Sequence, residues 1–125
     1  DAAREREIVE AFFRASRAGD FQALLAVLDP DVVLRPDAEA LRMGVRTGWL
    51  TQPILRGAKA VAEQFSGQAK AAQPALIDGV PGAVWVAGGK LRVAFAITLS
   101  GGKVAAIDLI ADRERLSHMR IEMLP

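Results

Sequence analysis

The sequence predicts an α+β domain in which about three helices pack on one face of a curved, mostly antiparallel sheet. Three runs of alternating apolar residues follow one another between Val84 and Ala111, and glycine-rich turns join them, which is typical of consecutive hairpins. The first third of the chain instead carries apolar residues at helical spacing. Helices that precede a series of strands favour a helix layer on one face of a sheet. Such a sheet wraps into a cone, and we expect a pocket at its open end.

Length and composition fit a single domain that spans residues 1–125. The chain is 51% hydrophobic and 25% charged, which is ordinary for a globular protein. Its 16 basic and 15 acidic residues give a net charge of +1, and the basic residues are scattered, so we expect no direct DNA binding by this domain. No apolar run approaches the roughly 20 residues of a membrane span. We therefore expect a soluble, cytoplasmic protein.

Residue types that hold metal ions or activate nucleophiles are scarce. The chain has no cysteine, which excludes disulfides and thiolate ligands, and His118 is its only histidine, so neither a histidine cluster nor a Ser-His-Asp triad can form. The pairs Gly88-Gly89 and Gly101-Gly102 belong to hairpin turns and match no phosphate-binding pattern. The sequence predicts neither a metal site nor a cofactor.

Three helices are expected. The first covers Ala2 to Ala18, where apolar and charged residues occupy opposite sides of the helix. A short second helix containing Leu24 and Leu28 ends at the Asp29-Pro30-Asp31 break. The third begins at Ala58 and continues to about Ala72.

Five strands are expected, and the segments between them are turns or irregular chain. The strands are Val32 to Arg35, Pro74 to Asp78, Val84 to Ala87, Leu91 to Leu99 and Val104 to Ile110. A turn from Gly79 to Gly82 joins the second strand to the third. Asp37 to Pro53 has no clean period, which indicates a long loop or irregular hairpin. The tail from Asp112 to Pro125 is expected to form a short helical turn followed by an extended segment.

Two aspartates and one arginine are candidates for catalysis. Asp108 is a carboxylate in the middle of an otherwise apolar strand, and facing an apolar pocket it would be suited to general acid–base chemistry. With Asp37 and Arg35 it would resemble the Asp-Arg-Asp set of epoxide hydrolases, in which carboxylates activate water and the arginine orients one of them. Alternatively, Asp108 is exposed to water or pairs with an arginine such as Arg92, and turn chemistry alone explains an aspartate after Pro36.

Aromatic and sulfur-containing side chains are the candidates for a ligand pocket. We expect Trp49, Trp85, Met43 and Asp108 to line it, with Trp49 best placed because it lies in the irregular segment. The other aromatic residues are more consistent with the core. The chain has no tyrosine, which argues against isomerase chemistry that needs a phenolic hydrogen-bond donor.

Three segments carry a resemblance to a known family. They are Gly19 to Ala38 (GDFQALLAVLDPDVVLRPDA), Leu55 to Ala58 (LRGA) and Ile107 to Leu116 (IDLIADRERL). With them the chain resembles the SnoaL-like group of the NTF2-like (nuclear-transport-factor-2-like) superfamily over nearly its whole length. More narrowly, it is similar to the domain fused to the C-terminal side of actinobacterial-type extracytoplasmic-function RNA polymerase sigma factors.

Two motifs of those sigma factors are altered here. A DGGGK-like motif usually follows the first strand, where this chain has Asp37 followed by Ala38-Glu39-Ala40. An NPDKL-like or DPERL-like motif usually follows the last long strand, where this chain has Asp112 to Leu116 with Arg113 in place of proline.

The resemblance implies a cone-shaped fold and a regulatory role. The chain would be a single SnoaL-like domain excised from a longer sigma factor. It would modulate transcription initiation by contact with the sigma region of its parent chain, and through that region with RNA polymerase. A small apolar ligand would occupy its pocket. The residues expected at the partner contact are Asp112, Glu114, Arg115, Leu116 and His118.

Two other functions stay open at this point. One is a small enzyme of the isomerase, cyclase or epoxide-hydrolase type that uses Asp108 and Asp37. The other is a homodimer that uses its sheet face only for assembly. The direction in which the two carboxylates point discriminates the enzyme from the regulatory domain.

Overall fold

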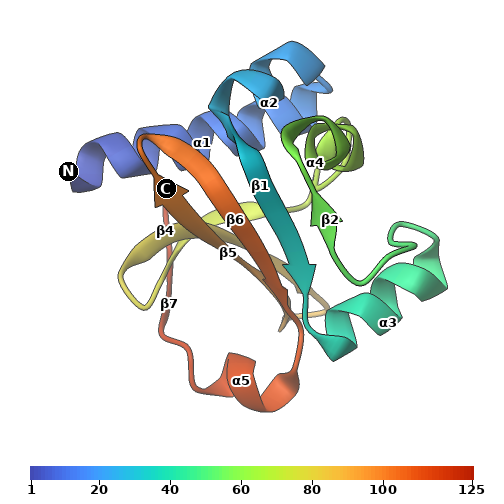
Figure 1. The fold of residues 1–125 in the computed structure, drawn as a ribbon. Coiled ribbons are helices and arrows are strands. Elements are labelled where there is room, and N and C mark those ends of the chain that lie inside the picture. Colours follow the sequence, from blue (N-terminus) through green and yellow to red (C-terminus); the bar gives the residue numbers. More distant parts are fainter.

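The computed structural model describes residues 1–125, which form one seven-stranded sheet and five helices (Figure 1). The strand order is β2-β1-β6-β5-β4-β3-β7, and every pairing is antiparallel except that of β1 with β6. The elements are α1 (Ala2–Ala18), α2 (Phe21–Val27), β1 (Leu28–Pro36), α3 (Ala38–Thr47), β2 (Leu55–Arg56), α4 (Ala58–Phe65), β3 (Gln73–Ile77), β4 (Val80–Ala87), β5 (Lys90–Ser100), β6 (Lys103–Ile110), α5 (Arg113–Ser117) and β7 (Ile121–Met123). The predicted α+β class with a curved, mostly antiparallel sheet is confirmed.

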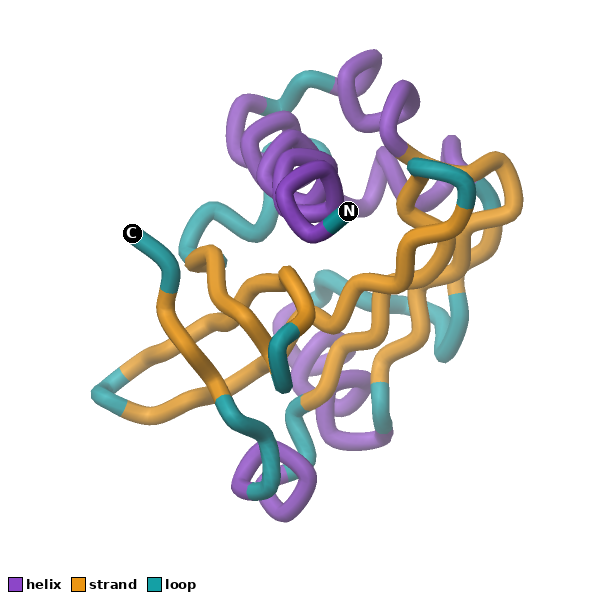
Figure 2. Tube along the Cα trace, turned by 90° about the vertical axis from the view of Figure 1, so that its left-hand side faces the viewer, coloured by secondary structure: helices purple, strands orange, loops and turns teal.

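The sheet separates two hydrophobic clusters of unequal size. The large cluster has 22 buried residues and joins α1, α2, α3 and α4 to one face of the sheet. At its centre Phe12 of α1 meets Phe65 of α4 edge to face, with ring centroids 5.1 Å apart. The small cluster has 6 buried residues on the other face, where α5 contributes Leu116. Four helices thus cover one face instead of the predicted three, and Figure 2 shows α1 nearly end-on above the sheet, with α5 at the opposite end of the molecule.

The segment predicted as a long loop contains a helix, α3. Asp37 is its N-cap and accepts a hydrogen bond from the Ala40 N–H at 2.8 Å, while Gly48 ends it with φ of 79°. The prediction was wrong because Gly44 lies in the helix interior, where glycine weakens a helical pattern. After α3 the chain continues through an irregular stretch to the two-residue strand β2.

Three other boundaries differ from the prediction. β1 begins at Leu28 because the Asp29-Pro30-Asp31 segment forms a bulge within the strand instead of a break. β4 begins at Val80 because Asp78 and Gly79 alone make the turn, with φ of 50° and 83°. α4 ends at Phe65 because the next residues bond to α1: the Gly67 N–H donates to the Ser16 carbonyl at 2.8 Å.

Apart from β2, which the sequence did not predict, the remaining elements follow the predicted order. α1 and the tail, with α5 followed by β7, match the prediction, and β5 and β6 match within one residue at each end. None of the five helices has the length and apolar character needed to cross a bilayer.

Candidate functional site

A cavity of about 470 Å³ lies between α3, the segment after α4 and the helix-covered face of the sheet. Most of its lining is apolar, which is the usual character of a small-molecule site. The lining residues are Ala40, Met43, Gly44, Arg46, Thr47 and Trp49 from α3 and its C-terminal side, Gln68 to Ala72 after α4, and Trp85, Val93, Phe95 and Leu109 from the sheet.

Trp49 forms a fixed wall of this cavity. Its indole N–H donates to the Gln64 carbonyl at 3.2 Å, and the Gln64 side-chain amide donates back to the Trp49 carbonyl. The Trp49 ring also meets Phe65 edge to face, at 5.5 Å between centroids and 84° between planes. The indole N–H is therefore used within the protein, and the ring offers a ligand only apolar surface.

Three of the four predicted pocket residues lie together, and the fourth does not. Met43, Trp49 and Trp85 all line the cavity. Asp108 is on the other face of the sheet. Its register partner on β5 is Ala96, which packs against the small cluster. The prediction for Asp108 was wrong because both faces of β6 carry buried apolar residues, so alternation alone does not show which face meets the cavity.

Asp108 pairs with Arg35, not Arg92. The two residues are register partners on the parallel strands β1 and β6. Arg35 Nε donates to Oδ1 at 2.9 Å and Arg35 Nη2 to Oδ2 at 3.0 Å, a bidentate pair whose side chains are 49% and 31% exposed. The hydrogen bond to Asp108, with the attraction of its charge, raises the pKa of Arg35 above its usual value. Arg35 is therefore a permanent cation that holds this carboxylate.

Asp37 does not join that pair, and its carboxylate is occupied elsewhere. Oδ1 caps α3, and Oδ2 accepts hydrogen bonds from the N–H groups of Ala111 and Asp112, each at 3.0 Å. Arg115 Nη1 is 3.8 Å from Oδ2. The side chain is only 13% exposed. Asp37 thus joins the end of β1 and the start of α3 to the residues that follow β6.

The cavity lining contains no Asp, Glu or His side chain. Neither Asp37 nor Asp108 is part of it, so the predicted Asp-Arg-Asp set does not surround a common space. No group of three or more Asp, Glu or His residues is arranged to hold a metal ion. The lining can enclose an apolar body, but it supplies no carboxylate or imidazole to transfer protons.

The predicted partner-contact residues cluster around α5, and one of them is buried. Glu114, Arg115 and His118 are exposed, and the Asp112 side chain caps the helix by accepting from the Arg115 N–H at 2.9 Å. Leu116 is only 7% exposed and packs in the small cluster, so most of its side chain is used within the protein. Its position follows from the amphipathic turn, which directs one apolar side chain under the helix.

Two surface grooves flank α5. One, of about 590 Å³, is lined by Asp78, Asp112, Glu114, Arg115, His118 and Met119. The other, of about 440 Å³, runs towards α3 and is lined by Glu39, Met43, Arg46, Leu91, Arg92, Ala111, Asp112, Arg113, Glu114 and Leu116. The predicted contact residues therefore border both grooves.

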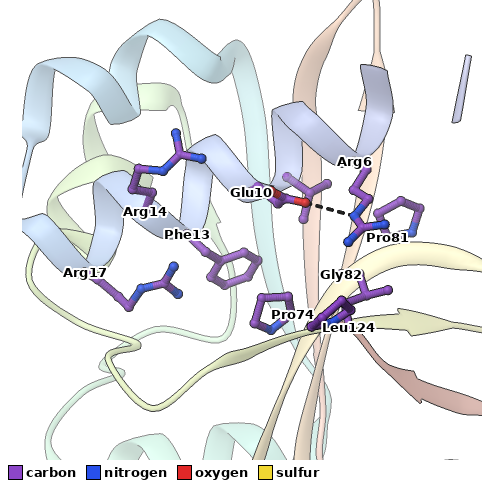
Figure 3. A pocket seen from close by; sticks show the side chains of 11 residues that line it. Arg6, Glu10, Phe13, Arg14, Arg17, Pro74, Pro81, Gly82 and Leu124 are labelled. Carbon is purple, nitrogen blue, oxygen red and sulfur yellow. Dashed lines mark hydrogen bonds and ion pairs between the residues drawn. The ribbon is translucent and has the colours of Figure 1, made fainter. Parts of the chain in front are cut away.

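A smaller hollow of about 100 Å³ lies beside α1 (Figure 3). Arg6 and Glu10 form an ion pair at 2.9 Å at one end of it, and Arg14 and Arg17 extend from the same helix. The Phe13 ring points towards Pro74 and fills part of the space. The hollow is too small for a ligand of the size that the main cavity admits.

Apart from Met43, the sequence did not predict the α3 and post-α4 residues of the cavity. The signal for α3 was present: Ala40, Met43, Gly44 and Thr47 recur at helical spacing and mark one helix face. Lys70, in contrast, lies in a stretch that was expected to be helical, and nothing local indicates that it borders a cavity.

Comparison with known proteins identifies the architecture. The sequence matches no protein-family model and no curated protein sequence. A crystal structure of an NTF2-like protein from Burkholderia xenovorans is similar over 94% of this chain and 95% of its own, with a TM-score of 0.59 and 21% identity. The chain has the NTF2-like fold. The resemblance inferred from sequence is thus confirmed at the level of fold.

Two further solved structures are similar to this chain. The Mycobacterium tuberculosis extracytoplasmic function sigma factor SigJ is similar over 91% of this chain, with a TM-score of 0.66 and 26% identity. This chain spans only 44% of SigJ. A putative polyketide cyclase from Sinorhizobium meliloti is similar over 88% of this chain and 99% of its own, with a TM-score of 0.55 and 17% identity.

Proposed function

We propose that this NTF2-like chain is the C-terminal regulatory domain of an extracytoplasmic-function sigma factor and acts through contact with the sigma region of its parent chain. The observation that carries the proposal is the similarity to SigJ, which extends over 91% of this chain and has a higher sequence identity than either of the other two comparisons. RNA polymerase and promoter DNA would be bound by the sigma region and not by this domain.

The geometry supports a binding role over a catalytic one. Asp37 and Asp108 are held by structural hydrogen bonds outside the cavity, so the two carboxylates that the alternative isomerase, cyclase or epoxide-hydrolase activity would use do not lie where a substrate would bind. We therefore do not propose that alternative.

The surface around α5 is the proposed contact with the sigma region. Its exposed side chains carry both signs of charge, from Arg113, Glu114 and Arg115. The two grooves beside α5 provide concave surface on either side of these charges. A short charged helix between two grooves is suited to bind a segment of the sigma region that lies across it. The charges of α5 would then determine how that segment is aligned.

Calorimetry between this chain and the sigma region of its parent, supplied as a separate purified fragment, tests the contact. We expect saturable binding that Arg113→Ala and Glu114→Ala each weaken by about fivefold, which is the upper range for exposed charge contacts. Lys59→Ala, an exposed position on α4, is the matched control and should leave the affinity unchanged. Absence of binding, or equal weakening by all three variants, would contradict the proposal.

We also propose that the cavity binds a small apolar ligand. Its volume of about 470 Å³ is within the usual range for small-molecule sites, and its walls are mostly apolar. Homodimer formation remains a prediction, and light scattering on the calorimetry samples measures it.

A further inference from the structure

We infer that the cavity selects an amphipathic anion, a molecule with an apolar body and one negatively charged group. The inference depends on the proposed ligand-binding role of the cavity and specifies the chemical class of that ligand. It rests on the separation of two kinds of lining: an apolar interior and a charged rim that is exclusively basic.

The interior would hold the apolar body. Trp85, Phe95 and Leu109 present side chains from the sheet, and Met43 and Trp49 close the space from the α3 side. Because the Trp49 N–H is bonded to the Gln64 carbonyl, this wall offers no polar group that would favour a hydrophilic molecule. An aliphatic chain or aromatic ring would gain free energy mainly by leaving water.

The rim would hold the negative charge. Arg46, from the last turn of α3, and Lys70, from the segment after α4, are the only charged residues of the lining, and both are exposed. Neither takes part in an ion pair of the structure. On the same helix Arg42 is neutralised by Glu39 at 2.9 Å. Arg46 stabilises the C-terminal end of α3, a role that leaves its guanidinium free to bind an anion.

The two cations would discriminate ligands by charge. A carboxylate, sulfonate or phosphate group at the rim would gain hydrogen bonds from Arg46 and Lys70. A neutral polar group would gain less, and an ammonium group would be repelled. Because the rim is open to solvent, the preference should weaken as salt screens the charges.

Intrinsic fluorescence reports binding directly, because both tryptophans of the chain line the cavity. We would titrate the 125-residue chain at near-neutral pH with decanoate, decanamide and decylamine, which share an apolar chain and differ in charge. We expect saturable one-to-one binding of decanoate that is at least about fivefold tighter than that of decanamide, with decylamine weakest. Raising the salt from about 0.05 M to about 0.5 M should reduce this difference.

Charge-removing variants assign the preference to the rim. Arg46→Gln and Lys70→Gln should each weaken decanoate binding by up to about fivefold and leave decanamide binding unchanged. Lys59→Gln is the control, since Lys59 is an exposed cation outside the lining. Equal affinity for the three ligands, no saturable binding of any, or an equal effect of all three variants would overturn the inference. The calorimetric test of the sigma contact contains no small ligand, so the two proposals fail independently.

Discussion

At the scale of single residues, Asp37 and Asp108 show how burial and hydrogen bonding give similar side chains different structural roles. Asp37 accepts three backbone hydrogen bonds through one carboxylate and is largely shielded from solvent. Asp108 makes one bidentate pair with a half-exposed arginine. The first should therefore contribute much more to stability than the second.

Asp37→Ala is expected to lower the free energy of unfolding by about 3 kcal/mol, because it removes a helix cap and leaves the Ala111 and Asp112 N–H groups without their acceptor. Urea unfolding at neutral pH measures this. Asp20→Ala is the matched control, since Asp20 only caps α2, and it should cost about 1 kcal/mol. Similar losses for both variants would refute the joining role of Asp37.

Asp108→Asn is expected to cost no more than about 1 kcal/mol, because its partner Arg35 is half exposed and water replaces the lost contact. Arg6→Gln, which breaks a comparably exposed pair with Glu10 on α1, is the control and should have an effect of the same size. The same urea experiment serves both variants. A loss of several kcal/mol in Asp108→Asn alone would mean that the pair supports the β1–β6 junction.

The residue types of the site could be predicted from the sequence better than their positions. Met43 and Trp49 are expected at a pocket because large apolar side chains in an irregular segment need cover, and Trp85 because aromatic side chains commonly line such sites. The face of Asp108 could not be predicted, since β6 is covered on both sides, by the large cluster at Ile107 and the small cluster at Ile110. Alternation identifies a face only when one side of the strand meets water.

At the scale of elements, α3 depends on one close approach. Gly44 lies under Leu50, which is buried and folds back over the helix, and the Leu50 N–H donates to the Gly44 carbonyl at 3.0 Å. A Cβ at position 44 would lie 2.6 Å from Leu50 Cγ. Gly44, which weakens the helical pattern in the sequence, is thus also the residue that allows Leu50 to pack on α3.

Gly44→Ala is therefore expected to destabilise the protein by about 1–3 kcal/mol, although alanine is the better helix former, because Leu50 must move out of its site. Thermal or urea unfolding measures the loss. Val45→Ala, which changes a 56% exposed side chain on the same helix, should stay within about 0.5 kcal/mol of the parent. Stabilisation by Gly44→Ala would show that helix propensity outweighs the contact.

At the scale of the whole molecule, the sheet keeps two cores of different size apart. The large cluster joins four helices to one face, whereas α5 and β7 depend on the small cluster of 6 residues. Class and element order were predictable from the sequence because hydrophobic period and glycine turns are local signals. The position of α5 on the other face was not, because nothing in its residue spacing distinguishes one face of the sheet from the other.

Leu116→Ala is expected to weaken the C-terminal region selectively, because Leu116 is the α5 residue of the small cluster. Hydrogen exchange should speed up by at least about tenfold for amides of α5 and β7, while amides of β5 and β6 keep most of their protection. Leu24→Ala, in the large cluster, is the comparison and should accelerate exchange throughout the sheet. Uniform acceleration in both variants would mean that the two cores unfold as one.

The parallel contact between β1 and β6 also constrains how the chain is made. Arg35 and Asp108 are 73 positions apart in sequence, yet they are register partners in the sheet. During synthesis β1 leaves the ribosome early, and it cannot pair with β6 until β6 has also been made. Closing the long loop between these two strands is slow. Until then its apolar residues stay available to other chains or to chaperones. A ribosome that stops before β6 would thus release a fragment in which β1 pairs only with the two residues of β2 and its other edge is open to aggregation.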